Sequence, residues 1–340
     1  MVPDVSREKI LVLFRTMLTI RRFEEALIKL TKSGVSVGHF HVYIGQECTG
    51  APTLSLYEPG DTVVSTHRNH GHLLARGADP GRLMAEILGR ATGYNKGKGG
   101  TLHVTVRELG FLSSSGIVGE SLPLATGAAF AAKQKKTGCV SFCFFGDGAL
   151  EEGVSYESMN LAALWSLPVI YLCENNSEEA LATSAGEYPG STIAIPELTT
   201  LAKTFNIPAV AVDGADVGEV YRAVREAVGR ARAGQGPSFI EAKTVRSPVT
   251  RFLWPDLVAG EMNLEWAWSR ETIPHAYKEW HESQDGLLRF TRELLQACLM
   301  TPDTLLQMDR DVRAEMEKAV EYAQESPYPD PQSALDDVFV

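Results

Sequence analysis

An acidic and an amide side chain follow two successive strands expected in the middle of the chain. Asp147 follows the apolar run 140–145 after one glycine, and Asn176 comes shortly after the apolar run 168–173. Ligands of open parallel sheets bind outside the carboxyl ends of the strands. If the two strands are neighbours, they lie about 5 Å apart, and both side-chain oxygens can reach one ion. Carboxylate and amide oxygens, completed by phosphate oxygens, suit Mg²⁺ or Ca²⁺ rather than zinc.

Two further features of this stretch favour a diphosphate as the ligand. Gly146 and Gly148 leave the backbone beside Asp147 open to a large anion, and a helix expected from near Glu151 offers free N–H groups. Taken singly, Gly-Asp-Gly is most often a tight turn, and Asn-Asn is most often a cap at the end of a strand. Together, at the two ends of one strand–helix–strand unit, they predict a site for a divalent cation and a diphosphate.

Apolar runs and the segments between them predict the elements that carry these residues. Strands are expected at 140–145, 168–173, 209–212 and 238–243, with helices at about 151–163 and 217–232. This alternation predicts right-handed βαβ units in a parallel sheet. Outside it, helices are expected from Ser6 to about Lys32, from Gly286 onward, and from Thr301 to about Gln324.

Three other stretches are predicted to be irregular. Residues 35–125 are rich in glycine and hold six of the eight histidines, a composition typical of loops that carry functional sites. Residues 246–280 contain Trp254, Trp266 and Trp268 among several helix breakers. The tail 326–331, Ser-Pro-Tyr-Pro-Asp-Pro, cannot be helical because its prolines lack the N–H group and restrict the residues before them.

The composition excludes several classes of protein. The 340 residues are 44% apolar and 22% charged, which is typical of a globular chain and not of a disordered or coiled-coil one. A net charge of −11 argues against a nucleic-acid-binding protein. The longest nearly apolar run, 161–173, is too short to span a bilayer, and the start of the chain does not resemble a signal peptide. Five cysteines without metal-site spacing indicate buried free thiols in a cytoplasmic protein.

The segment 146–176 resembles the thiamine-diphosphate motif. More narrowly, it resembles the α subunit of the decarboxylating component of 2-oxo acid dehydrogenase complexes, of the pyruvate or acetoin dehydrogenase type. The similarity covers most of the chain, through GHFHVYIGQE at 38–47, HRNHG at 67–71 with Arg76-Gly77, KGKGGTLH at 96–103, GIVG at 116–119 and the Ser-Pro-x-Pro-x-Pro tail. It implies an α/β thiamine-diphosphate-binding fold, with a parallel sheet flanked by helices and helical N- and C-terminal extensions. The implied parts are an N-terminal helix at 1–35, a diphosphate-binding domain at 36–245, and an irregular Trp-rich loop with C-terminal helices at 246–340, packed on the same domain.

The resemblance also implies a role for individual residues. Asp147 and Asn176 would bind Mg²⁺ together with the backbone carbonyl of Glu178. His41 and His103 would face the cavity as catalytic residues. The thiamine diphosphate itself would be contacted by His67, Arg68, Gly116, Val118, Gly146, Gly148, Ala149, Asn176 and Arg246.

The chain departs from the family pattern at two places. Glu178 stands where the family usually has a tyrosine, and Thr250 stands about where the family has the histidine of a Gly-His-Ser loop that assists acyl transfer. A Trp-rich stretch replaces that loop. We expect residues 246–270 to lie over the mouth of the cavity, with Arg246 and Arg251 available to an acidic or phosphorylated substrate. The alternative is that Trp266 and Trp268 pack the C-terminal helices onto the sheet.

The resemblance implies a partner chain and leaves three functions open. In the family a β-type subunit supplies the pyrimidine-side module and the catalytic glutamate, so two α and two β chains are expected, with the cofactor at their interface. The first function is transfer of an acyl unit from a 2-oxo acid to a lipoyl or acyl carrier protein. The second is a hybrid that moves a two-carbon ketol unit from a ketose to a carrier, as in transketolase. The third is a non-catalytic partner subunit, against which the intact Asp147, Asn176 and Arg68 argue.

Overall fold

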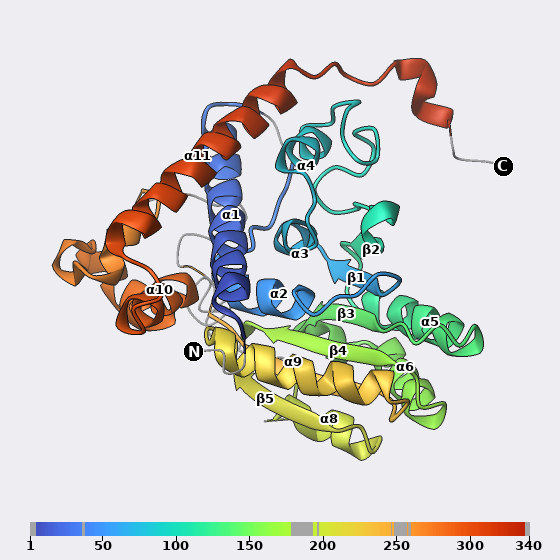
Figure 1. Cartoon of the computed structure of the whole chain (residues 1–340). Helices are drawn as coiled ribbons and strands as arrows, with labels where there is room; N and C mark the ends of the chain where they lie inside the picture. Colours follow the sequence, from blue (N-terminus) through green and yellow to red (C-terminus); the bar gives the residue numbers. More distant parts are fainter. Residues whose placement is uncertain are drawn as a thin grey trace.

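A parallel sheet with the strand order β2-β1-β3-β4-β6-β5 lies at the centre of the chain (Figure 1). The computed structural model describes residues 5–35, 38–177, 193–195, 197–245, 247, 257 and 260–336. The strands are β1 (Thr62–Thr66), β2 (Phe111–Ser115), β3 (Ser141–Gly146), β4 (Val169–Asn175), β5 (Ala209–Asp213) and β6 (Ser238–Lys243). The last four coincide with the four predicted strands to within two residues, and the expected parallel α/β fold is confirmed.

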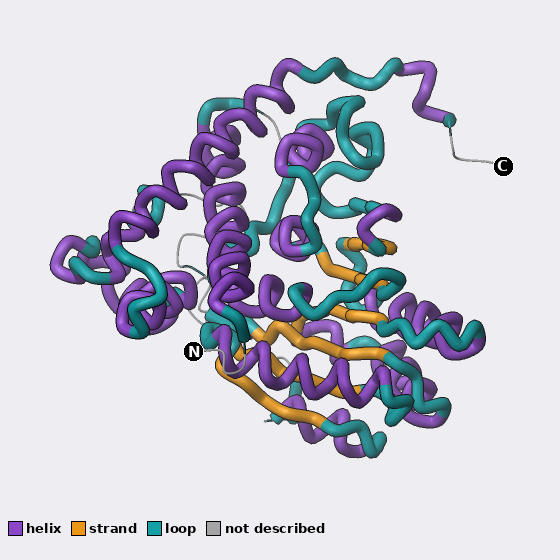
Figure 2. The backbone as a smooth tube through the Cα atoms, in the orientation of Figure 1, coloured by secondary structure: helices purple, strands orange, loops and turns teal. Residues whose placement is uncertain are grey.

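Helices make up most of the remaining described chain (Figure 2). The α-helices are α1 (Arg7–Lys32), α2 (Glu47–Leu54), α3 (Asn69–Ala75), α4 (Pro80–Ile87), α5 (Ser121–Gln134), α6 (Gly153–Leu164), α8 (Leu198–Thr204), α9 (Val217–Arg232), α10 (Gly286–Gln296) and α11 (Pro302–Glu325). Short helical turns are η1 (Arg107–Leu109), η2 (Asp147–Glu151), η4 (Leu264–Ala267), η5 (Arg270–Thr272), η6 (His275–Tyr277), η7 (Trp280–Gln284) and η8 (Pro331–Leu335).

The strands β3, β4 and β6 are buried on both faces, as is usual for parallel sheets, whereas the edge strand β5 is partly exposed. Alternate residues of β3 point to opposite faces: Phe142 and Phe144 join one apolar cluster, and Cys143 and Phe145 join the other. The first cluster contains side chains of α1, α2, α9, α10 and α11, and the second contains side chains of α5, α6 and α8. This arrangement explains why β3, β4 and β6 are nearly continuous apolar runs that do not alternate with polar residues.

The long helices at the two ends of the described chain form the expected extensions. α1 starts where predicted, because the Ser6 side chain accepts a hydrogen bond from the Lys9 N–H. Thr301 caps α11 in the same way through the Thr304 N–H, and Pro302 occupies the first turn. Figure 1 shows α1 and α11 side by side, away from the sheet. Among the described residues, no helix combines the length and apolar composition needed to cross a bilayer.

The prediction that residues 35–125 are mainly loop is wrong. This stretch contains α2, β1, α3, α4, β2 and the start of α5. The histidines were interpreted as residues of exposed functional loops, but two of them are buried inside the fold and contact polar partners. His70 lies on α3, where Nδ1 is 3.2 Å from the Glu24 carboxylate and Nε2 is 2.8 Å from the Thr101 hydroxyl. His72, one helical turn from the start of α3, is equally buried.

Two other expectations are modified by the structure. The helix expected from near Glu151 begins at Gly153, after the 3₁₀ turn η2. Trp266 is buried, and its ring centroid lies 4.6 Å from that of His281, so it packs the C-terminal elements together. Trp268 packs against the same apolar cluster. Arg251 and Trp254 lie outside the described residues.

The cysteines are free, and three of them match the expectation of buried thiols. Cys48, Cys143 and Cys173 are buried, whereas Cys139 is half-buried and Cys298 is exposed. Burial raises the pKa of each of the three buried thiols above its usual value. These thiols therefore stay protonated at neutral pH and do not serve as nucleophiles.

Candidate active site

The two predicted metal ligands lie at the same edge of the sheet. β3 and β4 are parallel neighbours, with Gly146 opposite Glu174, so Asp147 and Asn176 both follow the carboxyl ends of adjacent strands. The backbone N–H of Asn176 donates to Oδ1 of Asp147 at 3.4 Å. The two strands are therefore neighbours, as the metal-site prediction requires, and Asp147 and Asn176 lie together at their carboxyl ends.

A cavity of about 160 Å³ opens at this edge. It is formed by the segments that follow β1, β2, β3 and β4, as expected for a ligand site of a parallel sheet. Among its lining residues are eight that the sequence singled out: His67, Arg68, Val118, Gly146, Asp147, Gly148, Ala149 and Asn176. It is also lined by residues without a predicted role, namely Gln46, Ser65, Thr66, Ser115, Ile117, Gly119, Ser121, Phe145 and Glu174.

The floor of this cavity fits a diphosphate. A Cβ atom built on Gly146 or Gly148 would meet no other atom within 4 Å, so the space beside this backbone is open. Arg68 adds a positive charge: its side chain lines the cavity and is buried, with Nη1 donating to the Val42 carbonyl at 2.8 Å. Oxygen donors for a hard cation, an open glycine backbone and a fixed guanidinium together match a cation-bound diphosphate.

The remaining predicted residues lie at different distances from this cavity. Gly116 is flanked by the lining residues Ser115 and Ile117. The His41 ring is half-buried beside the cavity, with its centroid 4.6 Å from that of the lining residue His67. His103 is exposed, on the glycine-rich loop, and does not line the cavity. Glu178 and Arg246 lie outside the described residues.

A buried polar cluster that the sequence analysis missed lies behind the cavity wall. The lining residue Glu174 accepts hydrogen bonds from the hydroxyls of Tyr43 and Thr49. His72 Nε2 lies 3.0 Å from the Tyr43 hydroxyl, and its Nδ1 lies 2.7 Å from the hydroxyl of the lining residue Ser65. Burial, followed by the Glu174 charge, raises the pKa of Tyr43 well above its usual value. The Tyr43 hydroxyl therefore stays protonated and donates a hydrogen bond to the Glu174 carboxylate.

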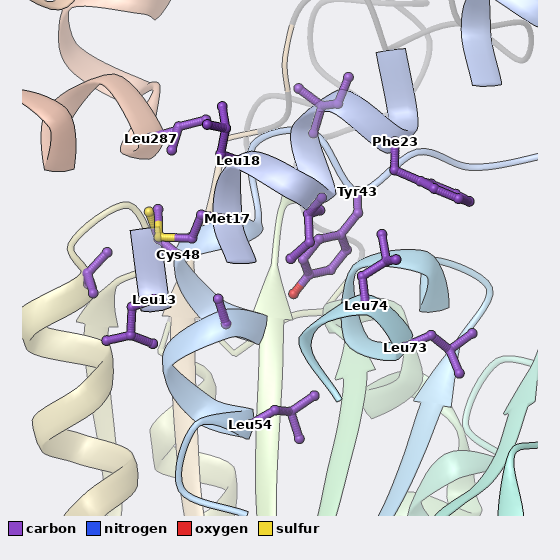
Figure 3. Close-up of a cluster of buried hydrophobic side chains, with 14 of the residues drawn as sticks. Leu13, Met17, Leu18, Phe23, Tyr43, Cys48, Leu54, Leu73, Leu74 and Leu287 are labelled. Carbon is purple, nitrogen blue, oxygen red and sulfur yellow. The ribbon is translucent and has the colours of Figure 1, made fainter. Parts of the chain in front are cut away.

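Two glycines make room for Tyr43. A Cβ atom on Gly71 would lie 2.0 Å from the Tyr43 ring, and one on Gly50 would lie 2.8 Å from its hydroxyl. Figure 3 shows the ring beneath α1 and beside Leu74 of α3. No short motif reveals this cluster, because its members come from α2, α3, β1 and β4 and from the segment before α2.

Comparison with known proteins identifies the class. The model of the dehydrogenase E1 component family matches residues 15–248, and the chain belongs to this family. It is 38% identical to the α subunit of acetoin:2,6-dichlorophenolindophenol oxidoreductase of Bacillus subtilis (strain 168), over 99% of this chain and 95% of that protein. It is also 38% identical to the pyruvate dehydrogenase E1 component subunit α of Zymomonas mobilis, over 98% of this chain and 90% of that protein.

The similarity over the full length defines the chain more closely. It is an α-type E1 subunit of the pyruvate/acetoin dehydrogenase type, an oxidoreductase component, as the sequence motifs indicated. The family generally uses thiamine diphosphate. The designation of the relatives as subunit α implies a β partner within a complex.

Proposed function

We propose that this chain binds the diphosphate half of thiamine diphosphate through Mg²⁺ and, with a β-type subunit, decarboxylates a 2-oxo acid and passes the acyl unit to a lipoyl group. The observation that carries the proposal is the pair Asp147 and Asn176 at the carboxyl ends of neighbouring strands, above an open glycine backbone. Bound thiamine diphosphate supplies a nucleophilic carbon for cleavage next to a carbonyl. The chain's own residues hold and orient that group.

Each part of the cavity has a separate task in this proposal. The Asp147 carboxylate and the Asn176 amide oxygen would bind Mg²⁺, and the family resemblance adds the carbonyl of Glu178 as a further ligand. Arg68 would compensate the diphosphate charge, and the N–H groups of Gly148 and Ala149 would donate to its oxygens. Gly116, Ile117 and Val118 would line the middle of the cofactor. His67 would contact the diphosphate, with Arg246 proposed from the family resemblance alone, and His41 and His103 would act on the substrate.

The size of the cavity supports the need for a partner. Ligand pockets usually measure about 300–1,000 Å³. The cavity of about 160 Å³ in this chain is smaller than that range. We infer that a second chain supplies the other half of the site, and with it the pyrimidine-side module and the catalytic glutamate. A complex of two α and two β chains satisfies this requirement.

Helix α5 offers the surface for that partner. It has no charged residue from Ser121 to Ala132, yet Leu124 and Phe130 are exposed on its outer side. Leu164 and Trp165 at the end of α6 extend this apolar surface, and the Phe130 and Trp165 rings lie 5.2 Å apart. A helix that is apolar all round belongs in an interior. Because Ser121 at the start of α5 lines the cavity, a β-type subunit on this surface would also close the cavity.

The experiment is to measure hydrogen–deuterium exchange at the thiazolium carbon of thiamine diphosphate with Mg²⁺. We expect exchange to accelerate when the chain is combined with its β-type subunit, and to remain at the solution rate with the chain alone. Acceleration by the purified chain alone would contradict the need for a partner. Failure of the complex to accelerate exchange would favour the non-catalytic alternative.

The substrate is tested separately with the same complex. We expect cleavage of a 2-oxo acid such as pyruvate, followed by acyl transfer to a lipoyl carrier. Cleavage of a ketose, with transfer of a two-carbon ketol unit to a carrier, would instead support the hybrid. The Thr250 position, where the family has a histidine, is the sequence feature that makes this second assay necessary.

A further inference from the structure

The segment after α11 lies against the loop that follows α4. This segment, residues 326–336, is called the C-terminal strap below, and Figure 1 shows it leaving the end of α11 and passing beyond that loop. The Ala91 N–H donates to the Pro327 carbonyl at 2.9 Å. The Arg90 guanidinium lies 3.8 Å from the centre of the Tyr328 ring. The prolines of the strap therefore hold it extended along the loop and keep it out of α11.

A single lysine ties the far end of the strap to the glycine-rich loop 96–103. Lys98 Nζ donates to the carbonyls of Ser333 and Asp336, at 2.7 and 3.1 Å. Both carbonyls belong to the end of the short helix η8, where the carbonyl dipoles attract a cation, and the Ser333 carbonyl also accepts the Asp336 N–H at 3.1 Å. Lys98 does not line the cavity, so its ammonium group binds the strap and not a ligand in the cavity.

The residues next to Lys98 are held from below by one buried carboxylate. Glu86 on α4 is fully buried. Its oxygens accept the backbone N–H groups of Gly97 at 3.0 Å and Gly99 at 2.7 Å, on either side of Lys98. The loop is thus fixed between α4 on one side and the strap on the other.

The same loop contacts both walls of the cavity. On one side, the Thr101 carbonyl accepts from Asn69 Nδ2 at 2.9 Å, and Asn69 directly follows the cavity residue Arg68. On the other side, the Leu102 carbonyl accepts from the Ser114 hydroxyl at 2.9 Å. A methyl carbon of Leu102 would also lie 3.5 Å from a Cβ atom on Gly116. The loop therefore contacts both segments that form the cavity walls, 66–69 and 114–118.

We propose that the C-terminal strap, acting through Lys98, positions the glycine-rich loop and through it the two cavity walls. Lys98 is a positioning residue in this scheme. The strap adds little to the apolar core: Tyr328 and Leu335 are 69% and 76% exposed, and no strap residue belongs to either apolar cluster. Its loss should therefore loosen the loop without unfolding the domain, because local order and global stability are separable.

The test compares Lys98→Met, a chain that ends at Glu325, and the two changes combined. Amide hydrogen exchange is measured in the purified chain over residues 93–103 and 63–70. We expect Lys98→Met to accelerate exchange in both segments about tenfold, the effect of losing about 1.4 kcal/mol of hydrogen bonding. The truncated chain should exchange at least as fast, because it also loses the contacts to Ala91 and Arg90. The combined variant should exchange no faster than the truncated chain, because truncation already removes both Lys98 contacts. Lys203→Met, at an exposed lysine of α8 near the opposite edge of the sheet, is the matched control and should change neither segment.

Two results would overturn the proposal. One is unchanged exchange in both segments of Lys98→Met. The other is an additive effect of the two changes, since Lys98 would then act independently of the strap. If the truncated chain does not fold, amide exchange in Lys98→Met alone still tests the proposal, because this variant keeps the strap.

A second readout connects the strap to the proposed function, on which this part of the inference rests. In the complex with a β-type subunit, Lys98→Met should weaken binding of thiamine diphosphate with Mg²⁺ several-fold, with Lys203→Met unchanged. Equal affinity of the two variants would contradict positioning of the cavity. If the wild-type complex binds no cofactor, the proposed function is wrong. The amide exchange measurement still tests whether the strap positions the glycine-rich loop.

Discussion

The backbone N–H of Asn176 is directed at the carboxylate of Asp147, 3.4 Å from Oδ1. This contact joins the ends of β3 and β4, which the ladder between Gly146 and Glu174 already holds in register. The Asp147 carboxylate is therefore held beside the Asn176 backbone. A carboxylate that is fixed beforehand loses little conformational entropy when a ligand binds.

The first prediction concerns Asp147. Among the proposed protein ligands, Asp147 is the one that contributes an anionic oxygen. Its removal leaves less negative charge from the protein to neutralise Mg²⁺ beside the diphosphate. We expect Asp147→Ala to weaken binding of Mg²⁺ and thiamine diphosphate at least about 100-fold, or about 2.7 kcal/mol. Calorimetry on the complex with the β-type subunit measures this. Asp303→Ala, at an exposed position in the first turn of α11, is the control. Equal affinities for the two variants would remove Asp147 from the site.

The sequence was sufficient for the part of the fold that carries this pair. β3, β4 and β6 are buried on both faces, so each is a continuous apolar run that periodicity finds easily. β1 and β2 were missed because they contain several serines and threonines. Ser65 and Ser114 are buried there only because His72 and the backbone of Leu102 and Val104 bond their hydroxyls. Such partners are distant in sequence, and no local pattern shows them.

The same limit applies to the candidate site. Asp147 and Asn176 were predictable because each follows a strand that the sequence reveals. Glu174 was not assigned a role, although it is two residues from Asn176 and lines the cavity. Its hydroxyl partner Tyr43 lies 131 residues earlier in the chain. The contact depends on how α2 and α3 pack over the sheet, which is a property of the whole fold.

The second prediction concerns the apolar surface of α5. Leu124 is 42% exposed there, and we propose that the β-type subunit covers it. Leu124→Arg should leave the melting temperature of the isolated chain nearly unchanged, because exposed substitutions usually cost less than about 0.5 kcal/mol. It should weaken assembly at least about tenfold, since a buried unpaired charge costs several kcal/mol. Sedimentation of the mixed subunits measures assembly.

Val12→Arg provides the matched control for this surface. Val12 is 58% exposed on α1, outside the α5 and α6 surface. The same charge introduced there should leave assembly intact. Normal assembly of Leu124→Arg, or an equal defect in both variants, would place the partner elsewhere.

The third prediction concerns the glycines around Tyr43. A Cβ atom on Gly71 would overlap the Tyr43 ring, whereas one on Gly229 of α9 would meet no atom within 4 Å. Gly71→Ala should lower the free energy of unfolding by about 1–3 kcal/mol, the usual cost of overpacking. Gly229→Ala should raise it by up to about 1 kcal/mol through helix propensity. Urea unfolding of both variants measures the difference, and equal effects would show that Tyr43 moves aside freely.

The last prediction concerns a buried ion cluster that joins α1, α2 and the start of α10. Arg21 of α1 donates to both oxygens of Asp285, at 3.0 and 3.1 Å, and to Glu47 of α2 at 2.6 Å. All three side chains are buried. His281 Nδ1 lies 3.0 Å from the second oxygen of Asp285. Breaking such a cluster at one member usually costs about 3–5 kcal/mol.

The pKa values of the two carboxylates in this cluster, Asp285 and Glu47, are shifted in opposite directions. Burial favours the protonated form of both. For Asp285 the Arg21 charge, with hydrogen bonds from His281 and Arg21, outweighs burial and holds the pKa well below its usual value. Glu47 has a single contact to Arg21 and is repelled by Asp285, so burial prevails and its pKa is raised. The bidentate contact explains why Asp285 is the carboxylate that stays ionised.

These two pKa shifts make the free energy of unfolding depend on pH in opposite directions. Below its unfolded pKa of about 3.9, Asp285 binds more protons in the unfolded state, so its contribution is present above that pH and is lost as the pH falls. Above an unfolded pKa of about 4.3, Glu47 binds more protons in the folded state, so its contribution is lost as the pH rises. Asp285→Asn should therefore cost about 3 kcal/mol near pH 6 and less near pH 3. Relative to wild type, Glu47→Gln should gain stability as the pH rises from 4 to 6. Urea unfolding of the three proteins at several pH values measures both slopes, and slopes of the same sign for the two variants would contradict the assignment of the charge to Asp285.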